Sequence, residues 1–478
     1  MRSPSPCWLS AVALLASSGA ALAGSLTNAL KVGDTKAARA LLAESSNPND
    51  AEAAGTTALH WAVHGGHADL AEGLLVAGAN VDATNRYGVP PLTLAAENGD
   101  ARMTQLLLTH GADANTALPK GETVLMTAAR TGDTATLDAL LAAGARVDER
   151  EGWKGQTALM WAAHENNAPA IATLLAAGAD RDARSAGGEF NAFLFAVRAG
   201  SVDATRALLD AGADVDETLA DGTSALVLAV TNAHYDVGAL LLERGADPNA
   251  AAQGWTALHQ IAWSRRWNMG FNLPGPAKSG DVDSLDLVRR LVAAGADIDA
   301  GVTKEPADGN RNKLDRIGAT AFLLAAKACD LPLMNLLLAQ GADASITTKA
   351  GTTAVMAAAG VGIWAPGENP GTPDEALAAV TLAFDAGGGD VNAIDANGET
   401  AMHGAVYRGG NLAVIQLLAD RGARVDVVNA KGWAPVTVAD GVEYTPDVLK
   451  RYPEAAALLR RLLADRGLPV PASTQPGR

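Results

Sequence analysis

Three histidines in the first fifth of the chain have a spacing that could bind a metal ion. His60 and His64 stand four residues apart, which places two imidazoles on one face of a helix, and His67 follows three residues later. A second segment, from Asp308, begins like a calcium-binding loop. It has Lys313 where the sixth-position glycine belongs and Ala319 where the closing glutamate belongs, so we do not expect it to bind calcium.

Motifs of other chemistries are missing from the sequence. It has no glycine-rich phosphate loop, no Gly-x-Ser-x-Gly and no His-Glu-x-x-His. The spacing of the polar residues indicates no pair of nucleophile and base. We therefore predict no catalytic residue, no cofactor-binding residue and no cofactor. An enzyme would need a site built by inserted loops.

The segment that contains the histidines recurs along the chain. Each copy has Thr followed by an apolar helical run, and a second helical run then ends in Leu-Leu-x-x-Gly-Ala or a close variant. A period of about 33 residues is typical of stacked-repeat proteins. The clearest copies begin at Gly55, Gly121, Gly155 and Gly398.

The residues of one repeat predict two short helices. Thr57 can cap the first helix through its hydroxyl, with His60 in the place of the Glu or Gln of a capping box. Gly66 ends this helix, and a second one is expected from about Ala68 to Ala77. Since two short helices cannot bury their apolar stripes alone, neighbouring repeats must stack.

This pattern closely resembles the ankyrin repeat, with its Thr-Pro-Leu-His-x-Ala signature. The resemblance runs from Leu26 to Leu463, although Pro90 and Ala434 replace the capping Thr. It implies an all-α solenoid of helix-turn-helix units joined by hairpin-like fingers. Because His60 and His67 then occupy ordinary repeat positions, we expect no metal site among the histidines.

The chain divides into three parts. Residues 1–23, with Arg2, an apolar run and a small-x-small site ending at Ala23, read as a cleaved signal peptide. Residues 24–467 form a single solenoid of ten clear repeats, with degenerate caps at 26–49 and 432–466. Residues 468–478 contain three prolines and are expected to be a disordered tail.

Charge and composition favour a soluble exported protein. Removing residues 1–23 takes away Arg2 and no acid, which changes the net charge from −16 to −17. This charge disfavours non-specific binding to nucleic acid or anionic membranes. The excess of Arg over Lys and the many alanines suggest a bacterial source, and two segments, 254–260 and 358–367, look familiar from bacterial ankyrin proteins. We expect a periplasmic or secreted monomer, with no membrane insertion after cleavage.

Three insertions interrupt the repeat period. Extra residues lie between the two helices of one repeat at 264–281, in a finger at 301–315, and again between helices at 361–374. Insertions in a repeat array form loops, often on the binding side. The first and third leave from equivalent points of their repeats, so we predict that they meet and form a binding site.

Aromatic and basic residues at two repeat positions are candidates for partner binding. Trp61 and Trp161 are expected in the core, because their position is buried in the family. Other tryptophans flank the finger glycine, and further side chains lie near the end of the first helix, which faces the concave side in the family. Together with the insertions, these positions yield Trp153, Trp255, Trp263, Arg265, Arg266, Trp267, Phe271, Trp364, Tyr407 and Trp433.

The sequence thus predicts an exported scaffold that binds a protein through its concave face and the inserted loops of its C-terminal half. One alternative is a small molecule or glycan bound by the aromatic loops. Another is an enzyme, or an enzyme accessory, with a loop-built site.

Overall fold

A computed structural model describes residues 25–44, 46–266, 278–306, 313–363, 370–445 and 448–471. The expected signal peptide at 1–23 lies outside these residues, as does most of the expected tail, from residue 472 onward. The described part is an all-α repeat, as predicted. It falls into two units, Met1–Ala220 and Asp221–Arg478.

The described residues of unit 1 form six helix pairs. In each pair a first helix of six to eight residues is followed by a second of nine residues. The helices are α1 (Leu26–Lys31), α2 (Thr35–Ala43), α3 (Ala58–His64), α4 (Ala68–Val76), α5 (Pro91–Glu97), α6 (Ala101–Thr109), α7 (Val124–Thr131), α8 (Thr134–Ala142), α9 (Ala158–His164), α10 (Ala168–Ala176), α11 (Ala192–Ala199) and α12 (Val202–Asp210).

In unit 2, the part of the chain that the structure describes forms six further pairs on the same plan. Its helices are α13 (Ala225–Thr231), α14 (Tyr235–Glu243), α15 (Ala257–Ser264), α16 (Ser284–Ala293), α17 (Ala321–Lys327), α18 (Leu331–Ala339), α19 (Ala354–Ala359), α20 (Pro373–Asp385), α21 (Ala401–Tyr407), α22 (Leu412–Asp420), α23 (Pro435–Gly441) and α24 (Pro453–Asp465). A short antiparallel pair, β1 (Val442–Thr445) and β2 (Val448–Lys450), separates the last two helices and was not predicted.

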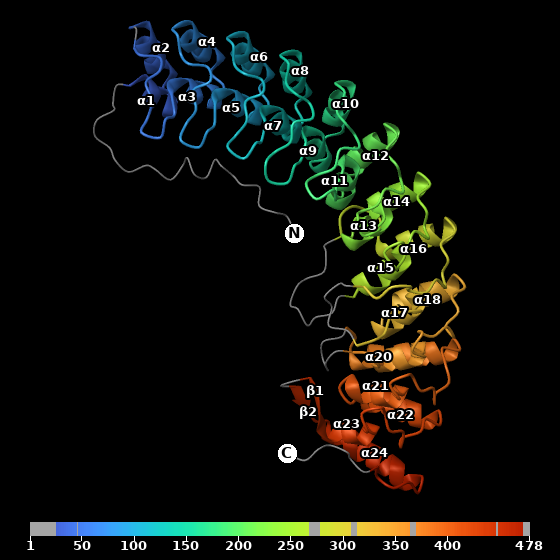
Figure 1. The fold of residues 1–478 in the computed structure, drawn as a ribbon. Helices are drawn as coiled ribbons and strands as arrows, with labels where there is room; N and C mark the ends of the chain where they lie inside the picture. Colours follow the sequence, from blue (N-terminus) through green and yellow to red (C-terminus); the bar gives the residue numbers. More distant parts are fainter. Residues whose placement is uncertain are drawn as a thin grey trace. The chain divides into compact units, whose positions relative to one another are not determined.

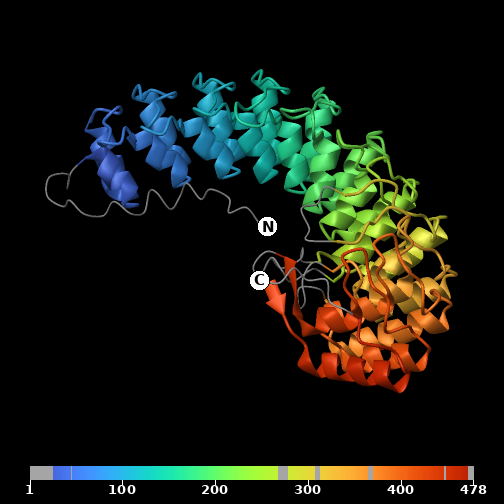
Figure 2. The ribbon, with the colours of Figure 1, turned by 60° about the horizontal axis from the view of Figure 1, so that its bottom comes forward.

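Within unit 1 the first helices pack side by side in one row and the second helices in a parallel row (Figures 1 and 2). The core lies between the rows and repeats the same small set of side chains. In the pair α3–α4, Leu59, Ala62, Leu70 and Leu74 are all buried. Each repeat therefore buries its apolar stripe against its neighbours, as the stacked pattern requires. No helix in the described ranges is both long and apolar enough to cross a membrane.

The predicted caps are present. Thr57 Oγ1 accepts a hydrogen bond from His60 N at 3.4 Å, while His60 Nδ1 lies 3.2 Å from Thr57 N and completes a capping box. His60 Nε2 lies 2.9 Å from the Val89 carbonyl, so the same ring ties the helix to the next finger. Pro90 provides no side-chain cap, as expected, and Pro91 occupies the first helical position instead.

In most repeats the turn after the first helix uses a left-handed residue. Gly66 has φ +67° and Gly132 has φ +79° at this point. Three repeats place a residue with a side chain there, namely Asn166, Ala233 and Cys329, with φ between +52° and +62°. A non-glycine residue in this conformation is strained, most of all for Ala and Cys. Cys329 is fully buried, which agrees with its assignment as a small core residue.

The repeated acids of the fingers connect neighbouring repeats. Asp82 Oδ1 accepts from Asp113 N at 3.2 Å, and Asp299 Oδ1 accepts from Asp343 N at 2.8 Å. Asn115 Oδ1 and Asn249 Oδ1 each accept a hydrogen bond from a backbone N–H of the next repeat along the chain, at 2.9 and 2.7 Å. Part of the acidic charge therefore has a structural role, because these side chains satisfy backbone N–H groups.

The insertions lie where the broken period places them. The first separates α15 from α16, the second lies in the finger between α16 and α17, and the third separates α19 from α20. Residues 267–277, 307–312 and 364–369 of these segments lie outside the described residues. The ends of all three insertions are described, and they are fixed to unit 2 by the contacts considered below.

Candidate functional site

In several repeats two positions face each other on the side where the fingers meet the ends of the first helices. One is the residue before the helix cap, and the other lies eight residues later. In unit 1, the Phe190 ring and the Arg198 guanidinium are 5.1 Å apart. In unit 2, the Trp255 and Trp263 rings are 5.7 Å apart, and the Tyr407 hydroxyl donates to Glu399 at 2.9 Å. We call the surface built from these paired positions the helix–finger face.

The helix–finger face of unit 1 contains a pocket of about 250 Å³. The first helices α3 and α5 form its floor, and three consecutive fingers form its walls. It is lined by Thr56, His60, Trp61, His64, Asn85, Tyr87, Val89, Thr93, Leu94, Glu97, Leu118, Pro119, Lys120 and Glu122. Three repeats thus contribute to one mostly apolar depression that carries a few polar groups.

Two carboxylates of this pocket share one cation. Arg130 lies 3.5 Å from the Glu97 carboxylate, and its charge also acts on Glu122. Burial nevertheless raises the pKa of Glu122 above its ordinary value, since Arg130 and the Thr127 hydroxyl, 3.1 Å away, only partly offset the desolvation. Glu122 therefore binds a proton more readily than an exposed glutamate does, and Arg130 is the cation that acts on both carboxylates.

The same face of unit 2 carries the side chain of Arg316, the residue that follows the second insertion. The Arg316 guanidinium lies 5.4 Å from the Trp263 ring, whose other neighbour is Trp255. Arg316 is buried and its Nε donates to Glu305 at 2.7 Å. The end of the insertion therefore packs on the tryptophan pair as a folded part of unit 2.

Ion pairs fix the ends of the first and third insertions. Arg265 Nε donates to the buried Asp330 carboxylate at 2.7 Å. Arg266 Nη2 lies 2.9 Å from Glu375, the third residue of α20, and Arg266 also donates to the Cys329 carbonyl. Arg266, near the start of the first insertion, thus contacts the residue that follows the third insertion, while the predicted meeting of the two loops involves residues outside the described ones and stays a prediction. The two arginines are therefore engaged within the chain.

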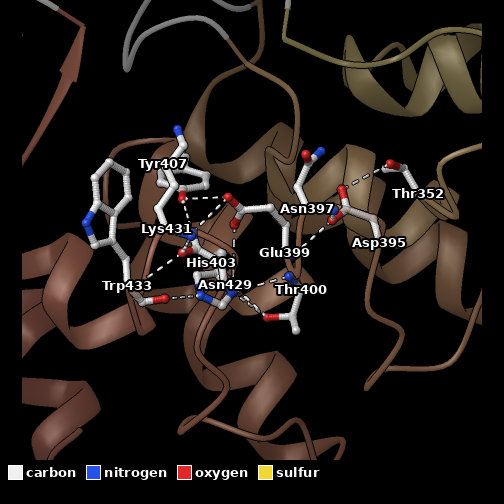
Figure 3. Close-up of polar contacts among 10 residues, drawn as sticks. All are labelled: Thr352, Asp395, Asn397, Glu399, Thr400, His403, Tyr407, Asn429, Lys431 and Trp433. Carbon is white, nitrogen blue, oxygen red and sulfur yellow. Dashed lines mark hydrogen bonds and ion pairs between the residues drawn. The ribbon is translucent and has the colours of Figure 1, made fainter. Parts of the chain in front are cut away.

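A buried polar cluster lies near the end of unit 2. Glu399 Oε1 accepts from Tyr407 Oη at 2.9 Å and from Asn429 Nδ2 at 3.0 Å (Figure 3). Burial raises the pKa of Glu399 to about 7. His403 is buried beside Glu399, and its Nε2 forms a hydrogen bond with the Trp433 carbonyl at 3.0 Å. Burial lowers the pKa of His403 to about 4. Both side chains are therefore largely neutral near pH 6.

Comparison with known families agrees with this repeat geometry. A family model described as "Ankyrin repeats (3 copies)" matches residues 92–185, 165–252 and 193–269, and one described as "Ankyrin repeat" matches 54–86 and 397–430. Together they cover slightly more than half of the chain. It belongs to the ankyrin-repeat family. The helix pairs and helix caps described above are those expected of ankyrin repeats.

Comparison with solved structures also returned ankyrin repeats. The crystal structure of the human ASB11 ankyrin repeat domain is 29% identical and covers 47% of this chain and 98% of that one, with a TM-score of 0.42. The search of curated proteins found no match.

The predicted partner-binding residues have different environments in this ankyrin-repeat protein. Trp153 is 76% exposed at the tip of a finger, while Trp255, Trp263 and Trp433 are half-buried. Tyr407 is only 4% exposed, so the expectation that it presents a surface anchor is wrong: its hydroxyl satisfies Glu399 and draws the ring inward. The remaining predicted residues, Trp267, Phe271 and Trp364, lie outside the described residues.

The sequence argument missed most of the residues that line the pocket. Trp61 and Trp161 are half-buried, which corrects their assignment to the core. Trp61 borders the pocket together with Tyr87 and Lys120, neither of which was proposed. The eight-residue spacing between finger and helix end, which joins Glu122 to Arg130, is a signal that could have pointed to this face. In the described ranges, no three His, Cys, Asp or Glu residues gather as metal ligands.

Proposed function

We propose that this chain is a scaffold that binds another protein through its helix–finger face. Ankyrin repeats generally mediate protein–protein interaction and typically act as non-enzymatic binding scaffolds, which supports this general role. The observation that carries the proposal is the pocket of about 250 Å³ on unit 1, to which three successive repeats contribute. A surface of this kind offers a recess for an anchoring side chain and extended rims beside it.

The size of the pocket favours a protein partner over a free small molecule. Sites for drug-sized ligands enclose roughly 300–1,000 Å³. The pocket has about 250 Å³, near the lower end of this range, and three repeats contribute to it, which suits one or two side chains of a longer segment. The glycan or small-molecule alternative would need the inserted loops to supply the remaining contacts.

In unit 2 the proposed contact surface includes the insertions and Trp433. The ends of the insertions are held by the ion pairs of Arg265 and Arg266, so they form a stable base for a contact surface. Such preorganisation lowers the entropy lost when a partner binds. Trp153, at an exposed finger tip of unit 1, is a further proposed contact.

Capture experiments with the full chain test this function. A Trp61→Ala, Tyr87→Ala double variant addresses unit 1, and a Trp267→Ala, Trp364→Ala double variant addresses the insertions. Val76→Ser is the matched control, because Val76 is 77% exposed at the end of α4, away from the pocket. We expect either double variant to capture less partner from the native source while melting at the same temperature as the control. Full capture by both double variants would refute the helix–finger face as the binding surface.

We also propose that the chain is exported. The supporting pattern is Arg2, an apolar run and the Ala21-Leu22-Ala23 site. Intact-mass measurement of protein from the native source is expected to show a chain that begins at Gly24. A full-length chain in the cytosol would contradict export and leave the binding role unaffected.

A further inference from the structure

The unit 1 pocket combines aromatic walls with an acidic end. Trp61, Tyr87 and Leu118 provide apolar surface, and the carboxylates of Glu97 and Glu122 both border the same space. Both carboxylates come from paired positions of the helix–finger face, Glu97 from the end of α5 and Glu122 from the finger before α7. A ligand that fits must therefore present an apolar stem and a polar tip.

The charges around the pocket are not balanced by the chain. Glu97 and Glu122 share Arg130, and Glu151 adds a third negative charge that acts on Glu122. The Glu151 carboxylate already accepts from the backbone N–H groups of Trp153 and Lys154 at 2.6 and 2.7 Å. Lys120 lines the pocket but is exposed at its rim. A cation at the inner end would relieve the repulsion between the carboxylates.

The molecule already places guanidinium groups on aromatic rings of this face. Arg316 lies 5.4 Å from Trp263, Arg198 lies 5.1 Å from Phe190, and Arg130 lies 5.9 Å from Trp161. All three distances fall within the range of a cation–π contact. A basic side chain across an aromatic ring is thus a recurring arrangement of the helix–finger face.

The rings of the pocket also have cations nearby, on surfaces that the pocket does not use. Lys31 lies 5.7 Å from the Trp61 ring and is paired with Glu52, while Arg86 lies 4.9 Å from the Tyr87 ring. Neither Lys31 nor Arg86 is among the residues that line the pocket. The pocket side of the two rings therefore stays open to a ligand.

We propose that the unit 1 pocket binds an arginine side chain from an extended segment of the partner protein. The aliphatic stem packs against Trp61, Tyr87 and Leu118, and the guanidinium reaches Glu97 and Glu122. Arginine fits better than lysine because its planar fork can donate to two carboxylates and stack on a ring. This inference rests on the proposed scaffold function and adds the chemistry of the anchoring residue.

A pair of isosteric peptides tests the proposal. The full chain is titrated with acetyl-Gly-Gly-Arg-Gly-Gly-amide and with the same peptide carrying citrulline, which has the shape of arginine without its charge. The readout is the NMR resonance of the Trp61 indole N–H, assigned with Trp61→Phe. Concentrations up to roughly 10 mM are needed, because a single side chain supplies only a few kcal/mol of binding free energy. We expect saturable movement with arginine and affinity at least about tenfold weaker with citrulline.

Charge variants complete the test. Glu97→Gln with Glu122→Gln is expected to weaken arginine binding by about tenfold or more. Glu165→Gln, which removes an exposed acid of unit 1 outside the pocket, is expected to leave it unchanged. Equal binding of arginine and citrulline, an unaffected double variant, or a Trp61 resonance that does not move would each overturn the proposal. None of these results would alter a finding that partner capture depends on Trp61 and Tyr87. The arginine proposal and the scaffold function can therefore be refuted independently.

Discussion

The two units use the same repeat positions in different ways. In unit 1 the helix–finger face carries a pocket that borders on Trp61, and that pocket has no insertion beside it. In unit 2 the corresponding face is partly occupied by the chain itself, since Arg316, at the end of the second insertion's finger, lies on the Trp255–Trp263 pair. The comparison teaches that an aromatic residue at these positions attracts a cation, which an insertion can supply from within the chain.

The buried carboxylates show a second difference. Glu122 and Glu399 both precede the capping threonine of their repeats, and the residue eight positions later is Arg130 in one case and Tyr407 in the other. Arg130 partly offsets the desolvation of Glu122. Tyr407 offers Glu399 a hydrogen bond at 2.9 Å without a charge, and Glu399 accordingly has a pKa of about 7. A cation in the paired position thus acts on Glu122, whereas Glu399 has only a neutral hydrogen-bond donor there.

The largest expected effect comes from removing a buried partner in unit 2. Asp330 caps α18 and also pairs with Arg265, whereas Asp100 caps α6 without an ion pair of this kind. We expect Asp330→Ala to cost about 3–5 kcal/mol, because it leaves a half-buried guanidinium unpaired. Asp100→Ala is expected to cost about 1 kcal/mol, the value of a lost cap.

Amide hydrogen exchange measures both changes locally, at α18 and at α6 respectively. A local measurement is needed because each repeat contacts only its neighbours, so different repeats can unfold separately. Equal losses in the two helices would show that the Arg265–Asp330 pair adds nothing beyond the cap.

The next effect is a pH dependence centred on Glu399. Its folded pKa of about 7 exceeds its ordinary value of 4.5, so the folded state binds the proton more tightly than the unfolded state does. The stabilisation is present below about pH 4.5 and is lost as pH rises through 7, a total of roughly 3 kcal/mol. The free energy of unfolding of Glu399→Gln, relative to that of wild type, is therefore expected to increase by this amount between pH 4.5 and pH 8.

His403 and His259 act in the opposite direction. Their folded pKa values of about 4 lie below the ordinary 6.5, so their contribution to stability rises with pH between these values. The contribution of the Glu399 carboxyl is therefore given only by the difference in stability between Glu399→Gln and wild type. Amide hydrogen exchange at α21 measures this difference. Direct ¹³C titration of the Glu399 carboxyl is the control, and a midpoint near 4.5 would contradict the assignment.

Arg316→Ala tests the self-occupied face of unit 2. We expect a loss of about 1–2 kcal/mol, since a desolvated cation–π contact and the ion pair with Glu305 are both removed. Arg198→Ala in unit 1 is the matched variant, with an expected cost of about 0.5–1 kcal/mol because Arg198 is exposed. Urea unfolding followed by tryptophan fluorescence measures the change. A larger loss in Arg198→Ala would reverse the proposed contrast between the units.

The smallest effect concerns the strained turns. Ala233 in unit 2 has φ +57°, and Ala233→Gly is expected to stabilise its repeat by about 1 kcal/mol. Asn166 in unit 1 has φ +62°, but its side chain accepts from Ala204 N at 2.9 Å, so Asn166→Gly is expected to give no gain. Thermal melting compares the two variants, and equal gains would show that the Asn166 hydrogen bond does not matter.

Much of the fold could be predicted because it depends on local chemistry. The capping role of Thr57 and the position of all three insertions follow from residues that are close in the sequence. Cys329 was placed correctly because it stands in a glycine position of the repeat. These features need only the repeat period and helix-capping rules.

The candidate site was harder to predict because it depends on contacts between repeats. Tyr407 has the same repeat position as exposed residues, yet Glu399 and Asn429 draw it inward. The partners of Arg265 and Arg266, at Asp330 and Glu375, come from two later repeats and cannot be inferred from spacing alone. Such pairings depend on how the insertions fold back, which local patterns do not encode.

Site-specific photo-cross-linking tests most directly the central claim that the open helix–finger face of unit 1 binds a protein. A benzophenone amino acid replaces Tyr87, at the pocket, or Val76, at the end of α4, in otherwise unchanged chains expressed in the native source. The account predicts a discrete adduct with one partner from position 87 and none from position 76. No adduct from position 87, or adducts of equal yield from both positions, would contradict it.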